Sequence, residues 1–384
     1  MIEGDAAEKA RRAIILIPGF RREERFFLRD VLVRNLTTAE AFPLEPGERI
    51  EVAGEPGRRL NVKGVRGRPR GPDLDVFEAY WADMAQEAAE LGPWRKLGNG
   101  LELLAYWLFS WRAWRALAVS RYITLGLMLS GLILVFWYVA LVLLVADTVR
   151  KDPALSQNIV GLPVLGGLLE AFYGAADAIG QWYWWLLIAF VFSFVPVDAL
   201  VQLARFVKDY FENKPDESEV GLRHRMRRRV SATLEQVLAE PYREVVVVAH
   251  SFGTVLAVDV LAGWPHREDF RRSIALITLG SPIAVLGYRS KWLDGERRQL
   301  LGHPDLSIWL DFHARTDWLC TAVPGHAERY RDQSRELDFE APLGRRLSGQ
   351  THLLYYRHPA VLEALAAPLP ECSSGRSACP RQSP

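Results

Sequence analysis

Short apolar runs typical of buried strands alternate with helical patterns at the two ends of the chain. Near the N-terminus, AIILIPGF predicts a strand that ends in a Pro-Gly turn, and DLDVFEAYWADM predicts a strand leading into a helix. Between these two, ERIEVAG and RRLNVKGV predict a pair of strands joined as a hairpin around Gly54 and Gly57. This part of the chain supplies too few strands for a core of its own.

The C-terminal part continues the alternation of strands and helices. RHRMRRRVSATLEQVLAE has apolar residues at helical spacing, and it precedes the strand EVVVVAH, a helix from Gly253 to about Gly263 and the strand SIALITLGSP. SIWLDFHA predicts a last strand, followed by a long loop and a helix that starts near Pro359. Alternation of this kind predicts a mainly parallel sheet with helices on both faces. We therefore expect one α/β domain, assembled from residues 1–100 and 205–368.

The middle of the chain, residues 101–204, has a different pattern. Eight of the 13 tryptophans lie between Trp94 and Trp185, in the region that also holds the two most apolar stretches. No charged residue occurs from 122 to 146, and a helix of about 20 such residues crosses a membrane. The segment 182–201 is a second candidate span, and its first residues resemble an interfacial aromatic belt. The insert is predicted to be a transmembrane hairpin; a pair of buried core helices is the alternative.

Lysine and arginine are concentrated outside the two predicted spans, which places both flanks and both termini in the cytoplasm. The loop 147–181 carries only Arg150 and Lys151, so we expect it on the opposite side. Whether its apolar part, residues 159–180, enters the membrane is left open. Residues 101–119 mix tryptophan with arginine, which is typical of an interfacial helix; an early start of the first span is the alternative. These features predict an integral membrane protein of the bacterial inner-membrane type.

Composition limits the partners and cofactors. The chain has 47 Lys and Arg against 46 Asp and Glu, so its charge gives no argument for nucleic-acid binding. Its three cysteines have no metal-ligand or disulfide spacing, and we expect a reducing compartment, no metal and no cofactor. Two of them lie in the Ser/Pro/Arg-rich tail 369–384, which we predict to be disordered. Gly126 and Ser130 form one small-xxx-small pair, a cue for a homo-oligomer through the hairpin.

VVVVAHSFGT places Ser251 directly after a predicted strand and before an apolar helix. The nucleophile of an α/β-type serine hydrolase occupies this kind of turn, written G-x-S-x-G. Here Gly253 supplies the second glycine and Ala249, another small residue, replaces the first. An acid and then a histidine should follow in the chain. The candidate acids are Asp294, Asp305, Asp311 and Asp317, and the candidate bases are His326, His352 and His358.

Three segments together resemble membrane-associated α/β-hydrolases of the lipase-like and serine-esterase-like families. These are VVVVAHSFGTVLAVDVL, the pattern W-x-x-F-x-x-x-x-D that ends at Asp317, and H-x-x-Y-x-x-x-P-x-V that begins at His352. The resemblance implies an α/β-hydrolase fold with Ser251 as nucleophile, Asp317 as orienting acid and His352 as general base. It also implies the backbone N–H groups of Phe20 and Phe252 as oxyanion donors, although Pro-Gly-Phe stands where many relatives have His-Gly.

A membrane-anchored serine hydrolase is the function that these features predict. It would cleave an acyl ester of a lipid or another amphiphile through an acyl-serine intermediate, in contact with membrane lipids. An acyltransferase or thioesterase with the same triad is one alternative. A non-catalytic membrane interaction protein that keeps the fold is the other. A channel is disfavoured, because neither span carries an obvious intramembrane charge.

Overall fold

A computed structural model describes most of the two ends of the chain and little of its middle. The described residues are 11–20, 24–39, 44–63, 72–87, 135, 139, 151, 197–215, 220–265, 274–317, 319–326, 333–347 and 349–367. The chain divides into two compact units, one formed by Met1–Glu87 with Asn213–Pro384 and the other by Ala88–Glu212. The first unit therefore joins the two ends of the chain.

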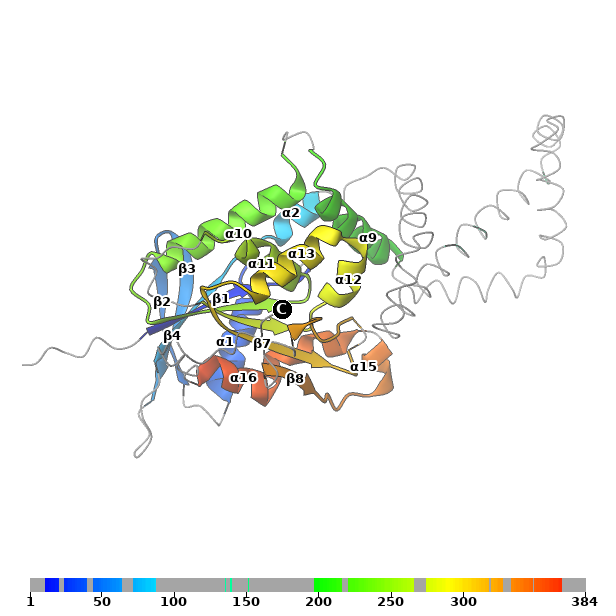
Figure 1. Cartoon of the computed structure of the whole chain (residues 1–384). Helices are drawn as coiled ribbons and strands as arrows, with labels where there is room; N and C mark the ends of the chain where they lie inside the picture. The colour runs from blue at the N-terminus through cyan, green and yellow to red at the C-terminus, as the bar shows by residue number, and fades with distance from the viewer. Residues whose placement is uncertain are drawn as a thin grey trace, which may run out of the picture. The chain divides into compact units, whose positions relative to one another are not determined.

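One sheet of eight strands forms the centre of the described part of the first unit, in the order β2-β3-β4-β1-β5-β6-β7-β8 (Figure 1). The strands are β1 (Arg11–Ile17), β2 (Leu44–Val52), β3 (Glu55–Val62), β4 (Asp73–Glu78), β5 (Glu244–His250), β6 (Ile274–Leu279), β7 (Leu306–Ala314) and β8 (Ser334–Leu337). From β4 to β8 neighbouring strands are parallel, whereas β2 and β3 form an antiparallel hairpin and β3 is antiparallel to β4. The predicted α/β class with a mainly parallel sheet is confirmed.

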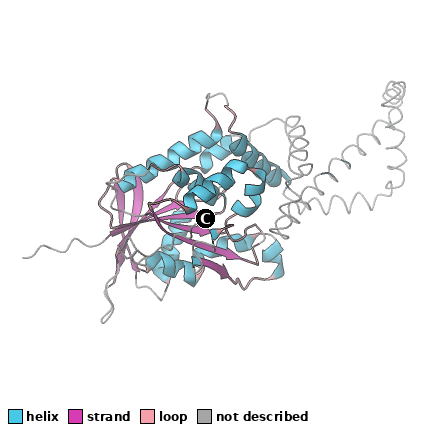
Figure 2. Cartoon of the chain, in the orientation of Figure 1, coloured by secondary structure: helices cyan, strands magenta, loops and turns pink. Residues whose placement is uncertain are grey.

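Helices cover both faces of this sheet (Figure 2). They are α1 (Phe27–Thr38), α2 (Ala82–Glu87), α10 (Leu222–Leu238), α11 (Phe252–Ala262), α12 (Ile283–Arg289), α13 (Lys291–Leu301), α15 (Leu343–Leu347), the 3-10 helix η2 (Gln350–Arg357) and α16 (Pro359–Ala366). In Figure 1, α10, α11 and α13 lie on one face, and α1 and α16 on the other. Because both faces are covered, the central strands are apolar at nearly every position.

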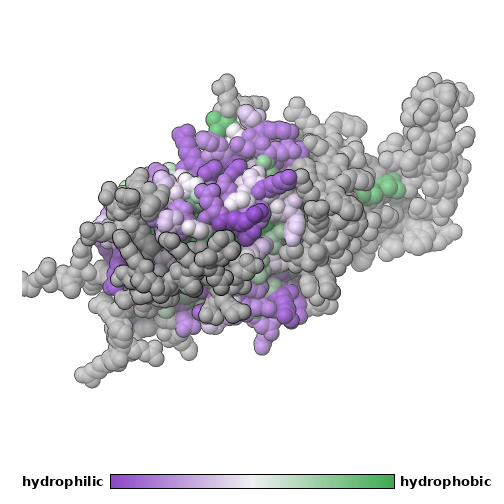
Figure 3. Space-filling model, in the orientation of Figure 1, coloured by the Kyte–Doolittle hydropathy of each residue, from purple (hydrophilic) through white to green (hydrophobic). Residues whose placement is uncertain are grey.

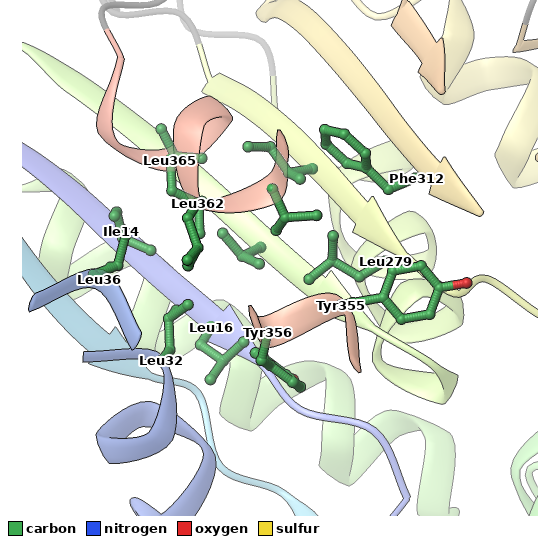
Figure 4. Close-up of a cluster of buried hydrophobic side chains, with 14 of the residues drawn as sticks. Ile14, Leu16, Leu32, Leu36, Leu279, Phe312, Tyr355, Tyr356, Leu362 and Leu365 are labelled. Atoms are coloured by element: carbon green, nitrogen blue, oxygen red, sulfur yellow. The ribbon is translucent and has the colours of Figure 1, made fainter. Parts of the chain in front are cut away.

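Strand β1 shows this double burial. Ile14 and Leu16 pack toward Leu32 of α1 and Leu362 of α16 (Figure 4). Side chains alternate along a strand, so Ile15 faces the opposite layer, and it is fully buried there as well. The unbroken run AIILI therefore reflects a strand buried between two helical layers.

The hairpin differs slightly from its prediction. Its turn lies at Ala53 and Gly54, which have φ angles of 49° and 88°. Gly57 lies within β3, where an added Cβ would sit 2.6 Å from Cε1 of Phe77. One predicted glycine thus makes the turn, and the other makes room for a ring on the neighbouring strand.

In the second unit the described helix is α9 (Val197–Glu212). It begins inside the segment 182–201, which is predicted as the second span, and it continues to Glu212. The second unit, Ala88–Glu212, ends at the last residue of this helix.

Within the described ranges, no helix combines the length and the apolar character needed to cross a membrane. Most of the predicted insert lies outside those ranges: of residues 101–204, the structure describes 135, 139, 151 and 197–204. The predictions for 101–119, for all but these single positions of 122–146 and 147–181, and for 182–196 therefore fall outside the described residues, as does the predicted tail 369–384.

Candidate active site

Ser251 lies in the sharp turn between β5 and α11. Its backbone has φ 54° and ψ −128°, a region that residues other than glycine seldom occupy. The Ser251 N–H donates to the carbonyl of Leu279 (2.9 Å), and the Ser251 carbonyl accepts from the N–H of Thr254 (3.0 Å). The strand, the strained turn and the helix together form the geometry of a nucleophile elbow.

Two glycines allow other backbone segments to approach this turn. A Cβ on Gly253 would lie 2.3 Å from the carbonyl oxygen of Ile17, and a Cβ on Gly19 would lie 2.7 Å from Cβ of Ser251. Ala249, which replaces the first glycine of the motif, is fully buried in β5. The close approach to the serine is therefore made by Gly19, from the loop after β1.

Asp317 and His352 are brought together by the fold. Nδ1 of His352 is 2.6 Å from Oδ2 of Asp317, and both residues are buried, with 8% and 1% of their surfaces exposed respectively. Asp317 lies in the loop after β7, where its N–H donates to the carbonyl of Ala314 (3.2 Å). His352 lies in η2, just before the final helix. A carboxylate on Nδ1 fixes the tautomer in which Nε2 can accept a proton.

Asp317 is surrounded by donors. The N–H of Leu319 donates to Oδ1 (3.1 Å), and the hydroxyl of Tyr355 donates to Oδ2 (3.1 Å). Burial alone would raise the pKa of Asp317, but attraction to His352 and the hydrogen bonds from His352, Cys320 and the Leu319 N–H lower it below its ordinary value. Asp317 is therefore held as a carboxylate.

Cys320 is a structural neighbour of this acid. Its Sγ is 3.0 Å from the hydroxyl oxygen of Tyr355. Burial first, and the charge of Asp317 second, raise the pKa of Cys320 well above its ordinary value. The side chain therefore stays a thiol, which is a poor nucleophile.

His250, which precedes Ser251, joins the serine turn to the histidine segment. Its Nε2 is 2.7 Å from the carbonyl oxygen of His352, and the two rings lie 4.6 Å apart between centroids. Gly280 packs against the same ring, because a Cβ there would be 3.0 Å from Cε1 of His352. Ser251 and His352 thus lie at the same edge of the sheet, and His250 contacts the backbone of the His352 segment.

Nε2 of His352 is buried and has no hydrogen-bond partner in the described part of the chain. The structure therefore brings Asp317 and His352 together, but it does not form a hydrogen bond between His352 and Ser251. In many hydrolases this bond is long in the free protein and shortens when substrate binds.

The other candidate acids lie elsewhere. Asp305 precedes β7, at the opposite end of the strand from Asp317. Asp294 pairs with Arg297 along α13 (2.7 Å). Asp311 is fully buried within β7, where it accepts from the hydroxyl of Thr278 (2.7 Å) and from the N–H of Val323 (2.9 Å).

The other candidate histidines have backbone partners. Nε2 of His326 is 2.7 Å from the carbonyl oxygen of Trp309. Nδ1 of His358 accepts from the N–H of Ala360 (3.2 Å) and so caps α16. His358 acts as a helix cap.

The two predicted oxyanion donors lie on either side of the serine turn. Phe252 is the first residue of α11, and Phe20 follows Gly19 in the loop after β1. Nε1 of Trp81 donates to the carbonyl of Pro18 (2.9 Å), and its ring lies 5.8 Å from that of Phe252 between centroids. Trp81 therefore connects the two backbone segments that would hold the oxyanion.

Glu78 is a feature to which the sequence pattern assigns no role. It ends β4, is 3% exposed, and its carboxylate accepts the N–H of Phe26 at the start of α1. Burial raises the pKa of Glu78 to about 7. The folded protein thus binds a proton at Glu78 in a pH range where the unfolded chain has lost it.

We expect Glu78 to lower the free energy of unfolding of the wild type by about 2 kcal/mol as the pH rises from about 5.5 to about 8. The sign follows because the folded pKa is raised: the contribution is fully present below the unfolded pKa and is lost as the pH passes about 7. Glu78→Gln should remove this part of the slope. Urea unfolding at several pH values measures it, and an unchanged slope in the variant would contradict the assignment.

The described residues contain no group of three or more His, Cys, Asp and Glu side chains that could hold a metal ion. Comparison of the chain with protein-family models, with curated proteins and with solved structures finds no match.

Proposed function

We propose that the protein is a serine hydrolase of the α/β-hydrolase type that cleaves acyl esters through an acyl-serine intermediate. The observation that carries the proposal is the buried 2.6 Å contact between Asp317 and His352, at the edge of the sheet where Ser251 occupies a strained turn. The order Ser, Asp, His along the chain is that of α/β-hydrolases.

The residues would act in two steps. As Oγ of Ser251 attacks the ester carbonyl carbon, its proton passes to Nε2 of His352, and Asp317 stabilises the imidazolium. The N–H groups of Phe20 and Phe252 donate to the oxyanion, and each such donor contributes about 3 kcal/mol. Collapse breaks the ester bond, and the leaving alkoxide takes the proton from His352. Water then attacks the acyl group, passes its proton to His352, and Ser251 recovers its proton as the acid leaves.

We also propose that residues 122–146 and 182–201 anchor this domain to a membrane, with the domain and both termini in the cytoplasm. The absence of charge from 122 to 146 and the distribution of lysine and arginine support this. A site held near a bilayer favours a lipid or another amphiphile as the ester substrate. A rate on long-chain esters in vesicles no higher than that on short soluble esters would remove the argument for a lipid.

Labelling with a fluorophosphonate probe tests the hydrolase proposal, because the probe reacts with activated serines. We expect labelling of the purified full chain and loss of labelling in Ser251→Ala. Ser307→Ala is the matched control, since Ser307 lies at the start of β7, at the end of that strand opposite Asp317. A folded wild type that stays unlabelled in detergent and in lipid would favour the non-catalytic interaction protein instead.

A further inference from the structure

A pocket of about 800 Å³ lies near the end of β4, where Tyr80 is one of its lining residues. Its walls come from α10, from α2 and the residues before it, and from the start of β3. On the α10 side the surface in Figure 3 is largely hydrophilic. The charged side chains that line the pocket include Arg25, Glu55, Asp83, Arg225, Arg228 and Arg229.

Four arginines and two carboxylates line the pocket, so positive side chains predominate in its lining. Both carboxylates already bind an arginine: Arg229 contacts Asp83 (2.6 Å), and Arg25 contacts Glu55 (3.4 Å). Glu55 also accepts from the hydroxyl of Thr233 (3.1 Å). The carboxylates hold two of the arginines in place, and among the described lining residues arginines outnumber carboxylates four to two.

One chain segment, residues 80–84, connects the pocket with the candidate active site. Tyr80 and Met84 line the pocket, and between them in the chain lies Trp81. Trp81 binds the loop after β1 through the carbonyl of Pro18 and packs on Phe252, next to Ser251. A ligand in the pocket would therefore lie against the segment that positions both predicted oxyanion donors.

We propose that this pocket binds a phosphate group. Four arginines line it, and a phosphate offers oxygens in enough directions to accept from more than one guanidinium group. The volume exceeds that of a single phosphate and is typical of ligand sites. Resting on the proposed function, the phosphate would be the head group of an amphiphilic ester whose acyl bond is cleaved at Ser251. The shared chemistry also admits a soluble phosphate.

Binding to the purified full chain in a neutral detergent tests the proposal. The probes are inorganic phosphate, and phosphatidic acid compared with diacylglycerol of the same acyl chains in mixed micelles. We expect phosphatidic acid to bind and diacylglycerol not to, and Arg228→Glu to weaken the binding at least about tenfold. Arg228 is exposed on α10, so the substitution should leave the fold intact; Arg228→Gln is the milder second variant. Arg49→Glu is the matched control, because Arg49 is exposed on β2 and does not line the pocket.

The outcomes separate the sources of the phosphate and the two proposals. Binding of inorganic phosphate that depends on Arg228, without a preference for phosphatidic acid over diacylglycerol, would support a site for a soluble phosphate. Equal binding by the wild type and Arg228→Glu, or no binding of either phosphate probe, would overturn the site. Ser251→Ala should bind as the wild type does. Loss of the hydrolase proposal therefore leaves this test intact, and failure of the pocket leaves fluorophosphonate labelling unaffected.

Discussion

Asp317→Asn should lower kcat on an acyl ester about 10⁴-fold while leaving the protein folded. An amide cannot accept the Nδ1–H of His352 with the strength of a carboxylate, so the ring loses its orientation and its imidazolium loses its counter-charge. The bond at risk is the buried 2.6 Å contact between the two residues. Steady-state kinetics on a chromogenic ester, normalised to folded protein, would measure the effect.

The control for this variant is Asp305→Asn, which removes the same charge at the opposite end of β7. We expect its kcat to stay within about threefold of the wild-type value, which is a difference of less than 1 kcal/mol in the barrier. Comparable losses in the two variants would point to a general effect of charge or stability. A fully active Asp317→Asn would show that Asp317 does not orient the base.

Two side chains, those of Tyr355 and His352, donate hydrogen bonds to the carboxylate of Asp317. The hydroxyl of Tyr355 donates to Oδ2 and points away from the apolar cluster that surrounds its ring (Figure 4). His352 donates to the same oxygen. The acid thus accepts hydrogen bonds from two side chains, and its lowered pKa means that it stays charged at neutral pH.

The strands of the sheet could be predicted where both faces are buried, because burial on both faces leaves an unbroken apolar run. EVVVVAH and IALITL are such strands, and both were placed correctly. Strand β8 was missed, since in SREL only Leu337 is buried. Helix α1 was missed for another reason: Phe26, in the left-handed region, precedes it and makes no side-chain cap, so no start signal is present in the sequence.

The candidate site could be predicted only in part, because only some of its features are encoded by neighbouring residues in the sequence. The turn at Ser251 is a local feature, and five consecutive sequence positions define it. The choice of Asp317 over Asp305 depends on which end of β7 faces His352, and family resemblance supplied that information. The environment of Glu78 depends on a segment 52 residues away, as in its hydrogen bond from the N–H of Phe26. The arginine pocket depends on contacts between α10 and segments more than 140 residues away, as between Arg229 and Asp83. No local pattern carries such contacts.

Arg12→Met should lower the free energy of unfolding by about 3 kcal/mol. Arg12 is fully buried in β1, where its Nε donates to Glu244 of β5 (2.7 Å). Its Nη1 donates to the carbonyls of Leu365 and Ala367 at the end of α16 (2.7 Å each). Methionine fills a similar volume but leaves these acceptors without their donor. Urea unfolding followed by circular dichroism would measure the loss.

Arg11→Met is the control, because it removes a charge from the neighbouring position of the same strand. Arg11 lies over the ring of Tyr242 at 5.6 Å, and we expect its loss to cost no more than about 1 kcal/mol. Equal losses of unfolding free energy in the two variants would mean that the loss comes from removing a positive charge from β1. The hydrogen bonds of Arg12 would then not account for it. Since α16 directly follows η2, which carries His352, Arg12→Met should also lower fluorophosphonate labelling at temperatures where the protein is still folded. Labelling that falls only as the protein unfolds would show that Arg12 stabilises the fold without positioning the base.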